Sequence, residues 1–318
     1  MSMMSSFATL AVLSLLASTS LAAEPVIRKV SFDSSGVALV GNLYLPAGAT
    51  GSNPAVVVTG SWTSVKEQNP AEYARRLAER GFAVLAFDHT GFGESGGAIR
   101  GYENPAAKVA DIKAAISFLE NLPEIDRTRI NGLGICAGGG YMARVAAEEP
   151  RLNAVATVAG WYTDAALYRE FFTPAGYAAL DQAGKAGRQA FETSGTVVTR
   201  PAVSDGSTPA AMAVQPAVDY YAGRARVPGW TETWPDLSYQ AILAFETIPS
   251  AANISIPALV VHAENAISPG AAYRHFRAIG ASEKELVWMG DVNQFQFYDD
   301  PAVVDAAVVR VADWFAKH

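Results

Sequence analysis

The sequence GLGICAGGGY, residues 132–141, contains the only cysteine of the chain, Cys136, with a glycine two positions away on each side. Residues 129–133 form a short apolar run that is typical of a buried strand, and residues 141–148 have the composition of a helix. The pattern predicts that a strand ends just before Cys136, that the chain turns sharply there, and that a helix follows.

Small residues around Cys136 are what a nucleophile at such a turn requires. The turn holds the nucleophile in a strained backbone conformation, so the residues two positions away must be small, as Gly134 and Gly138 are. The stretch therefore indicates a nucleophile elbow with a cysteine, in which the N–H group of Ala137 points at a developing oxyanion. The alternative is a buried structural cysteine, the usual state of a free thiol.

Two glycine-rich stretches also match the spacing of a dinucleotide-binding loop. Residues 91–96 fit G-x-G-x-x-G, but residues 97–105 after them have the composition of a loop, whereas the fingerprint requires a helix there. Residues 132–137 fit the variant that ends in alanine, but no acidic residue stands at the end of the next strand, at residues 159–161. Both matches are weak, and no cofactor is expected.

Apolar, β-branched runs alternate with helix-like segments along most of the chain. The expected strands are residues 55–59, 82–87, 129–133, 154–159, 258–262 and 286–289, and the expected helices are residues 71–80, 106–122, 141–148 and 301–316. Such unbroken apolar runs are typical of parallel strands covered on both faces. Residues 26–32 and 37–45 alternate instead, and the turn residues 34–36 predict an antiparallel hairpin. The fold class is therefore α/β, a doubly wound and mostly parallel sheet with an N-terminal antiparallel hairpin.

Residues 161–250 interrupt this alternation. They are rich in aromatic residues and include a polar, glycine-containing stretch at residues 193–207. We expect an inserted helical lid above the carboxyl edge of the sheet, with Trp161 at the substrate pocket. The alternative is a pair of core helices that only thickens the domain, since aromatic residues are most often core.

The composition narrows the class of protein. The 318-residue chain is 50% hydrophobic and 17% charged, which suits a well-buried globular core. Its formal net charge is −7 without any basic run, so nucleic acid is not an expected partner. No cysteine or histidine pair is spaced for a metal ion, and no metal is expected.

The N-terminus resembles an export signal. Residues 7–16 are apolar, and Ser20-Leu21-Ala22 fits the small-x-small cleavage pattern. This predicts a signal peptide at residues 1–22, a mature domain at residues 23–318, and a periplasmic or secreted protein. An N-terminal anchor that stays attached is the alternative. Because the run is shorter than the ~20 apolar residues of a membrane span, we favour cleavage and expect no stable membrane insertion afterwards.

Four stretches carry a resemblance to a known group: residues 61–68, 87–97, 134–141 and 295–299. Through them the chain resembles the α/β-hydrolase superfamily, on the branch of dienelactone hydrolase-like and polyketide transferase-like proteins. The resemblance implies a cysteine or serine nucleophile, a histidine after the last strand and an acid after the strand before it. It also implies that the loop after residues 55–59 donates a second oxyanion N–H group, from Ser61 or Trp62.

Two charged residues of the same loop are candidates for the pocket. Lys66 and Glu67 stand a few positions after the expected oxyanion residues, and Glu67 is a candidate partner for the thiol. The alternative is a solvated charge pair at the start of a helix.

The chain departs from the family pattern where the partners of the nucleophile are expected. Gln294 stands in the place of the family's histidine, and a glutamine orients a group without acting as a base. Ala266 stands where the aspartate would be, which leaves Glu264 as the nearest carboxylate.

Four histidines are the remaining candidates for a base. His89 follows the strand at residues 82–87, on the same sheet edge as the elbow; the alternative is that it braces the turn after it. His275 is expected on a surface helix, His262 packs or bonds to the backbone at a strand end, and His318 is the last residue. A thiol needs little help, because part of it is already ionised at neutral pH and a helix N-terminus lowers its pKa.

Three functions are compatible with these residues. The first is hydrolysis of a small ester, lactone or thioester through Cys136, and the second is acyl transfer on the same site to an acceptor other than water. The third is a binding protein on a hydrolase scaffold, which Gln294 and Ala266 keep in consideration. Oligomeric state does not follow from the sequence.

Overall fold

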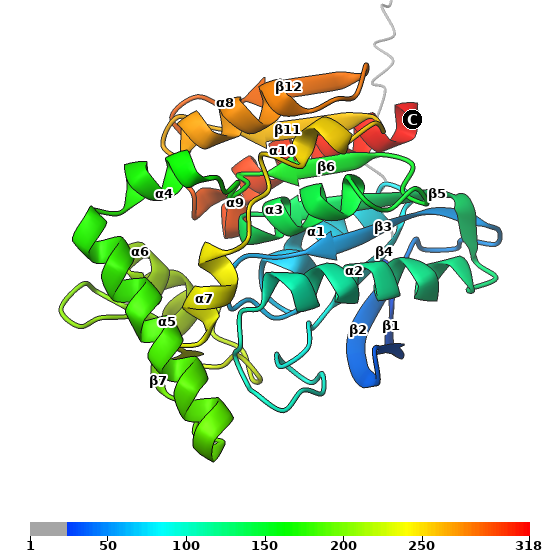
Figure 1. Ribbon diagram of the computed structural model, residues 1–318. Coiled ribbons are helices and arrows are strands. Elements are labelled where there is room, and N and C mark those ends of the chain that lie inside the picture. Colours follow the sequence, from blue (N-terminus) through cyan, green and yellow to red (C-terminus); the bar gives the residue numbers. More distant parts are fainter. Residues whose placement is uncertain (1–23) are drawn as a thin grey trace, which may run out of the picture.

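The computed structural model describes residues 24–318, so the signal peptide predicted at residues 1–22 lies outside the described residues (Figure 1). One sheet has the strand order β1-β2-β4-β3-β5-β6-β11-β12. These strands are β1 (Val26–Ser34), β2 (Val37–Leu45), β3 (Asn53–Thr59), β4 (Ala83–Phe87), β5 (Ile125–Ile135), β6 (Val155–Val158), β11 (Ala258–His262) and β12 (Lys284–Trp288). β2 pairs antiparallel with β1 and β4, and the remaining neighbours are parallel. The predicted fold class is confirmed.

The β1–β2 hairpin closes through a two-residue turn. Ser35 and Gly36 both have positive φ angles, 52° and 84°, and Ser34 pairs with Val37 across the turn. Positive φ at both central residues is the requirement of the turn type that matches the twist of paired strands. The glycine and the small polar residues before it therefore explain why the chain reverses here.

Helices cover both faces of the sheet (Figure 1). α1 (Asn69–Ala78) packs against α10 (Pro301–Lys317) on one face, and α2 (Pro105–Glu120) packs against α3 (Ala137–Ala146) on the other. α8 (Pro269–Ala278) lies against β11, and the short α9 (Gln296–Asp299) packs against α10. The start of α2 is capped: the Asn104 side chain accepts hydrogen bonds from the N–H groups of Ala106 and Ala107, with a proline at the first helical position.

The chain between β6 and β11 leaves the strand–helix alternation. Its elements are α4 (Ala165–Phe171), α5 (Pro174–Ser194), β7 (Thr199–Pro201), β8 (Val203–Ser204), β9 (Met212–Ala213), α6 (Gln215–Ala217), the π-helical turn η1 (Val218–Arg224), β10 (Thr233–Pro235), α7 (Ser238–Leu243) and the 3₁₀ turn η2 (Ala251–Asn253). α4 to α7 gather at one end of the sheet, at the left of Figure 1, where β5 leads into α3. That this segment acts as a lid remains a prediction.

The start of the helix after Cys136 differs from the expectation. α3 begins at Ala137 rather than at residue 141, so strand and helix meet directly at Cys136. The three glycines after Ala137 lower helix propensity, which is why they read as loop, but close packing of α3 on the sheet overrides that preference.

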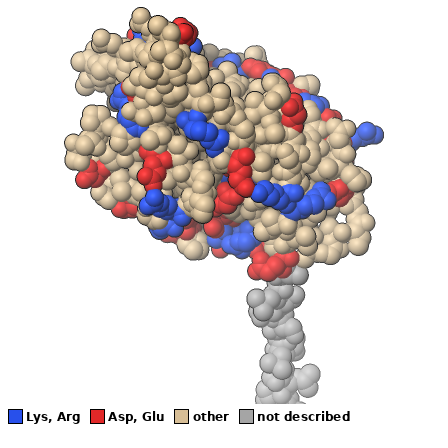
Figure 2. All heavy atoms as spheres, turned by 90° about the horizontal axis from the view of Figure 1, so that it is seen from below, with Lys and Arg blue, Asp and Glu red and all other residues tan. Residues whose placement is uncertain are grey.

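Charged side chains are interspersed over the surface. On the face seen in Figure 2, acidic and basic side chains alternate without a continuous basic stripe. No helix within residues 24–318 combines the length and the apolar character needed to cross a bilayer.

Candidate active site

Cys136 occupies the tight turn between β5 and α3. Its backbone has a φ of 57° and a ψ of −121°, a strained conformation for a residue with a side chain. A Cβ atom on Gly134 would lie 2.2 Å from the carbonyl oxygen of Gly138, and one on Gly138 would lie 2.5 Å from that of Thr59. Both distances are impossible contacts, so the two glycines are required by the turn as its sequence indicated.

The sulfur of Cys136 is buried and faces hydrogen-bond donors. Burial raises the pKa of the thiol, while hydrogen bonding from the Tyr298 hydroxyl and from the N–H groups of Ala137 and Trp62 lowers it. The net pKa is above the ordinary value, so the thiol is protonated at neutral pH. The N–H group of Ala137, at the start of α3, lowers the pKa as expected, but burial raises it by more, so the net shift is upward.

The second N–H donor at the elbow is that of Trp62. The alternative, Ser61, has its N–H directed at the side-chain oxygen of Asn69 (3.4 Å), and its hydroxyl accepts from the Asn69 amide (2.6 Å) and pairs with Tyr221 (2.5 Å). Ser61 therefore braces the loop, and the N–H groups of Trp62 and Ala137 together form the candidate oxyanion hole.

A buried carboxylate anchors the loop that carries Trp62. The indole N–H of Trp62 donates to the Tyr141 hydroxyl (3.1 Å), which donates to Glu103 (2.6 Å). The other oxygen of Glu103 accepts from the N–H of Thr63 (3.3 Å), and Lys108 neutralises the carboxylate at 2.6 Å. Since Glu103 is fully buried, this network fixes the position of the donor loop.

Gln294 lies in the loop after β12, close to the elbow. Its side-chain oxygen accepts from the N–H of Ile267 (2.8 Å), and its amide nitrogen donates to the carbonyl of Ala159 (3.1 Å) and to the Tyr298 hydroxyl (3.2 Å). None of these three hydrogen bonds joins Gln294 directly to Cys136. A parallel bridge between Asn265 and Asn293 holds the two loops side by side.

Glu264 does not take part in this arrangement. Its side chain is exposed and accepts a hydrogen bond from the indole of Trp288 at 3.2 Å, on the outside of the sheet. The place next to Gln294 that an acid would fill is taken by the backbone N–H of Ile267. The expectation that Glu264 serves as the acid of the site is therefore corrected.

His89 belongs to a buried network behind the site. Its Nε2 lies 2.8 Å from the Thr59 hydroxyl, and its Nδ1 lies 3.3 Å from the Asp111 carboxylate. Asp111 also accepts from the N–H (2.8 Å) and the hydroxyl (3.0 Å) of Thr90. Burial lowers the pKa of His89 despite Asp111, so the ring is neutral. His89 braces β3 and the start of its own loop, and neither nitrogen is directed at Cys136.

Lys66 and Glu67 also lie away from the thiol. The ammonium of Lys66 is buried and contacts Asp88 (2.8 Å), Glu94 (2.7 Å) and Glu67 (2.7 Å). Lys66 turns toward the end of β4 because Asp88 accepts both its ammonium and its backbone N–H. The pocket role expected for this pair is therefore corrected. The alternative of a solvated charge pair is also wrong, because Lys66 is only 1% exposed.

His262 and His275 pack against aromatic side chains and take no part in the site. His262 bonds to the Ala263 carbonyl at 3.1 Å and stacks on Trp288, as expected for a strand end. His275 lies on the buried face of α8, where its ring stacks on Tyr162 with centroids 4.0 Å apart. The expectation of a surface position for His275 is wrong, because α8 turns this side chain toward the sheet.

Trp161 covers the elbow from the inserted segment. Its backbone N–H donates to the carbonyl of Cys136 at 2.8 Å. Its ring packs edge-on against Trp62 (5.8 Å between centroids) and Phe171 (5.0 Å between centroids). Phe171 in turn contacts Phe172, which lines a cavity. An aromatic row thus connects the elbow to that cavity.

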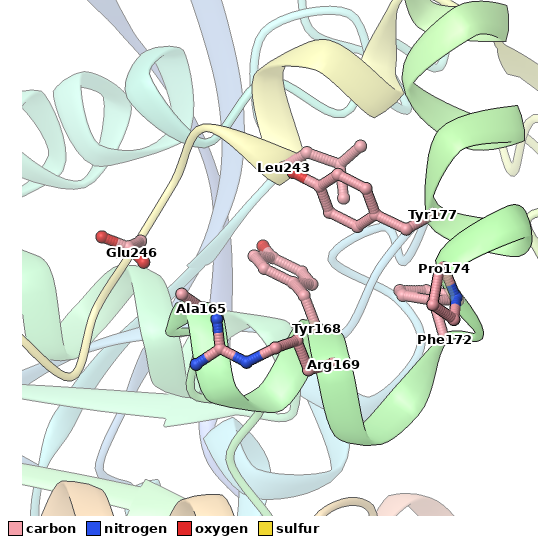
Figure 3. Close-up of a pocket in the computed structure, with 8 residues that line it drawn as sticks. All are labelled: Ala165, Tyr168, Arg169, Phe172, Pro174, Tyr177, Leu243 and Glu246. Atoms are coloured by element: carbon pink, nitrogen blue, oxygen red, sulfur yellow. The ribbon is translucent and has the colours of Figure 1, made fainter.

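The cavity lies between α4, α5 and α7 and has a volume of about 590 Å³ (Figure 3). Its lining is mainly apolar and aromatic, with two charged residues: Ala165, Tyr168, Arg169, Phe172, Pro174, Tyr177, Leu243 and Glu246. In Figure 3 the Arg169 side chain extends toward the side on which Glu246 lies. A second cavity, of about 750 Å³ and bordered by carboxylates and amides, reaches Gln294.

Two of the residues around the sulfur were missed by sequence reasoning as site residues. Tyr298 lay in a stretch that carried the resemblance, but its contact with Cys136 depends on the turn between β12 and α9. Glu103 stands in a loop without any motif. Nothing in the sequence around Glu103 indicated that its side chain would be buried.

The comparisons with known proteins show the family and the fold of the chain. The family described as serine aminopeptidase, S33 matches residues 67–292. The uncharacterized protein PA2218 of Pseudomonas aeruginosa is 32% identical over 320 residues, which cover 92% of this chain and 80% of that protein. The crystal structure of PA2218 superposes with a TM-score of 0.80 at 30% identity, covering 94% of this chain and 95% of the other.

Two fungal proteins match shorter parts of the chain. A thiohydrolase of Eupenicillium brefeldianum is 36% identical over 100 residues, 31% of this chain and 32% of that protein. The polyketide transferase claH of Penicillium crustosum is 32% identical over 117 residues, 36% of this chain and 38% of that protein.

Proposed function

We propose that this chain, which belongs to the serine aminopeptidase S33 family of the α/β-hydrolase superfamily, hydrolyses a small ester, lactone or thioester with Cys136 as nucleophile. The protein is a hydrolase-type α/β enzyme with acyltransferase-like relatives. Its family is described by a serine, whereas this chain carries a cysteine at the elbow, so the chemistry has to be argued from its own residues.

One arrangement carries the proposal: Cys136 lies at a strained turn between strand and helix, and hydrogen bonding from the backbone N–H groups of Trp62 and Ala137 acts to lower the pKa of its thiol. A carbonyl group that approaches the sulfur brings its oxygen to the same two donors. Those donors stabilise the charge that develops on this oxygen when the sulfur attacks, and each is worth about 10²–10³ in rate in comparable sites. A purely structural cysteine does not require this convergence.

The missing base limits the substrates to those with good leaving groups. The thiol is protonated, and the residue in the histidine position, Gln294, does not take up a proton. Amide hydrolysis requires protonation of a poor leaving group, so peptides fit this site badly. Thioesters, activated esters and strained lactones fit it better. The name of the thiohydrolase relative is consistent with a thioester.

The aromatic row and the cavity between α4, α5 and α7 support an apolar acyl group. Apolar cavities with few polar groups are the usual form of small-molecule sites. Leu243 is one of the cavity residues, and a Leu243→Trp substitution would fill part of the volume. We expect this variant to hydrolyse long-chain acyl thioesters more slowly while acetyl thioesters are hydrolysed at the original rate. An equal effect on both chain lengths would show that the acyl group lies elsewhere.

The main test uses the wild type, Cys136→Ala and Cys136→Ser with phenyl thioesters and nitrophenyl esters. We expect turnover in the wild type and none above background in Cys136→Ala. Intact-mass spectra after rapid quenching should show one added acyl group on the wild type only. Background rates in all three proteins, together with ligand-induced stabilisation, would instead indicate a binding protein on a hydrolase scaffold.

The site of action is proposed to be the periplasm or the cell exterior, after removal of residues 1–22. The small-x-small pattern that ends at Ala22 supports this. Expression of the full chain in a bacterium, followed by osmotic-shock fractionation and N-terminal sequencing, tests it. Protein that keeps its N-terminus and stays with the spheroplasts would contradict export.

A further inference from the structure

We propose that Thr63 and Trp230 form a latch that ties residues 218–230 of the inserted segment to the turn that carries Trp62. Through this latch Trp230 is a positioning residue, and the backbone N–H of Trp62 stays in place only while these residues of the inserted segment are docked. The inference rests on the proposed function, in which this N–H group is one of the two oxyanion donors.

Trp62 and Thr63 are the central residues of a tight turn, Ser61 to Ser64, which we call the donor turn. The N–H of Ser64 donates to the carbonyl of Ser61 (3.2 Å), and the Ser64 hydroxyl donates to the same carbonyl (2.8 Å). Thr63 has a φ of 61°, while the φ of Trp62 is not positive. A positive φ at the second central residue only is the pattern of a type II turn, and glycine is the usual residue at that position.

Threonine is a costly residue at this position. A β-branched residue rarely adopts a positive φ, and such strain persists only where surrounding contacts hold it. The N–H of Thr63 donates to the buried Glu103 carboxylate (3.3 Å), and its hydroxyl accepts from the indole N–H of Trp230 (3.2 Å). Glycine would keep the first of these contacts but not the second. The hydroxyl is therefore what threonine adds to the turn, and its partner comes from the inserted segment.

Trp230 is held against the donor turn by a second aromatic residue of the inserted segment. Its ring stacks on that of Tyr221 in η1, with centroids 5.8 Å apart and an angle of 15° between the planes. The Tyr221 hydroxyl lies 2.5 Å from the hydroxyl of Ser61. Both aromatic side chains are buried. Together they contact the residues on either side of Trp62.

A further hydrogen bond joins the inserted segment to the chain just after the donor turn. The side-chain nitrogen of Gln68 donates to the carbonyl of Ala225 (3.0 Å), and its oxygen accepts from the N–H of Val65 (3.1 Å). The residues before Ala225 form the π-helical turn η1, a rare element that is frequent at functional sites. Residues 218–230 thus contact the donor turn and its continuation at three points.

The donor turn also rests on the elbow. The carbonyl of Gly60, directly before the turn, accepts from the N–H of Gly138 (3.0 Å), and the ring of Trp62 packs against that of Trp161. The ends of the turn are therefore fixed by backbone hydrogen bonds, whereas its centre is held by side chains. If Thr63 relaxes to a negative φ, the peptide planes at the centre rotate and the N–H of Trp62 leaves the oxyanion position.

Loss of the latch is expected to affect the rate of the chemical step rather than substrate binding. Negative charge develops on the carbonyl oxygen only during attack, so a misplaced donor weakens the transition state more than the bound substrate. Such a loss lowers kcat and leaves KM nearly unchanged.

The first experiment compares Trp230→Phe with Trp288→Phe. Trp230→Phe keeps a ring on Tyr221 and removes the N–H that reaches Thr63. The control also loses one indole hydrogen bond, to Glu264 (3.2 Å), but on the outside of the sheet. With a phenyl thioester we expect Trp230→Phe to lower kcat by ~10-fold or more with little change in KM, and Trp288→Phe to keep both wild-type constants. An unchanged kcat in Trp230→Phe would overturn the inference.

The second experiment compares alanine and glycine at position 63. Thr63→Ala removes the hydroxyl but keeps a Cβ atom in the strained conformation, so we expect it to lower kcat as Trp230→Phe does, with no further loss in the double variant. Adding Thr63→Gly to Trp230→Phe should instead raise kcat above that of Trp230→Phe alone, because glycine keeps a positive φ without help. A packing defect at Trp230 would give no such rescue, and its absence would contradict the latch.

The third experiment, amide hydrogen exchange at the donor turn, needs no turnover. Loss of one hydrogen bond makes local opening roughly 3–10 times more frequent. Peptic peptides that contain residues 61–68 should therefore exchange faster by this factor in Trp230→Phe and at the wild-type rate in Trp288→Phe. Equal exchange in the wild type and Trp230→Phe would show that Trp230 does not hold the turn.

The outcomes separate the two proposals. If the wild type turns over no thioester, the proposed function fails, and the positioning role fails with it whatever the exchange rates are. If the wild type is active and Trp230→Phe is equally active, the latch alone is overturned. Cys136 would then be the nucleophile beside a donor turn that keeps its shape without the inserted segment.

Discussion

The strained backbone at Cys136 predicts that glycine is better tolerated there than alanine. Its φ of 57° and ψ of −121° are accessible to glycine without cost, whereas a residue with a Cβ pays about 2 kcal/mol. Replacing alanine by glycine also has two costs. Loss of the buried Cβ atom lowers the free energy of unfolding by about 0.8 kcal/mol, and the greater freedom of glycine in the unfolded chain lowers it by about 0.7 kcal/mol. The Cys136→Gly variant should therefore unfold with a free energy about 0.5 kcal/mol higher than that of Cys136→Ala.

A matched control is available in α10. Ala306 is exposed and helical, so Ala306→Gly should lower the free energy of unfolding by about 1 kcal/mol. The same exchange of alanine for glycine is thus expected to have opposite signs at positions 136 and 306, with a difference of about 1.5 kcal/mol. Urea unfolding followed by tryptophan fluorescence measures both, because the chain has six tryptophans.

The result that would refute this reasoning is a loss of about 1 kcal/mol on going from Cys136→Ala to Cys136→Gly, as at an ordinary helical position. The elbow would then store no strain. Activity is expected to be absent in both variants, so the stability comparison is independent of the chemistry proposed for the sulfur.

Glu103→Gln removes a negative charge that raises the thiol pKa, so the pH midpoint of Cys136 alkylation by iodoacetamide should move to lower pH; an unchanged midpoint would show that Glu103 acts only on the loop. Burial lowers the pKa of His275 to about 3, below the ordinary value of ~6.5, so its stabilising contribution is complete above pH ~6.5 and is lost as the pH falls toward 3. The His275→Phe variant keeps the ring stacking but has no group to protonate. On going from pH 7 to pH 4, the variant should lose about 3 kcal/mol less free energy of unfolding than the wild type loses. Equal losses in the two proteins would place the acid sensitivity at another residue. Gln294→His alone should not speed thioester turnover at neutral pH, because the Ile267 N–H would donate to Nδ1 and leave the ring proton on Nε2. Adding Ala266→Asp supplies an acceptor for Nδ1–H and should raise the rate, and a faster single variant would contradict this.

The strands and the elbow could be predicted from the sequence because their causes are local. Runs such as residues 55–59 and 258–262 are buried on both faces by helices, so they need an unbroken series of apolar side chains. Gly134 is required by a contact with Gly138 inside the turn, whereas Gly138 also faces the carbonyl of Thr59 on the neighbouring strand. The turn residues themselves stand in one short stretch of chain, where pattern reasoning works.

The partners of the sulfur could not be predicted because their causes are distant. Lys66 stands four residues after Trp62, yet its side chain turns toward Asp88 at the end of the neighbouring strand. Tyr298 was part of a recognised stretch, but only the fold of its loop brings its hydroxyl to Cys136. His89 stood at the correct sheet edge, and its direction was decided by Thr59 and Asp111, which come from two other elements.

The departures from the family pattern are coupled. Once Ala266 supplies no carboxylate, the Ile267 N–H is the group that faces position 294, and this donor requires an acceptor there. A glutamine meets that requirement with its oxygen and then presents two N–H groups to Ala159 and Tyr298, where a histidine would present one nitrogen in the wrong protonation state. Gln294 is therefore matched to the rest of this site.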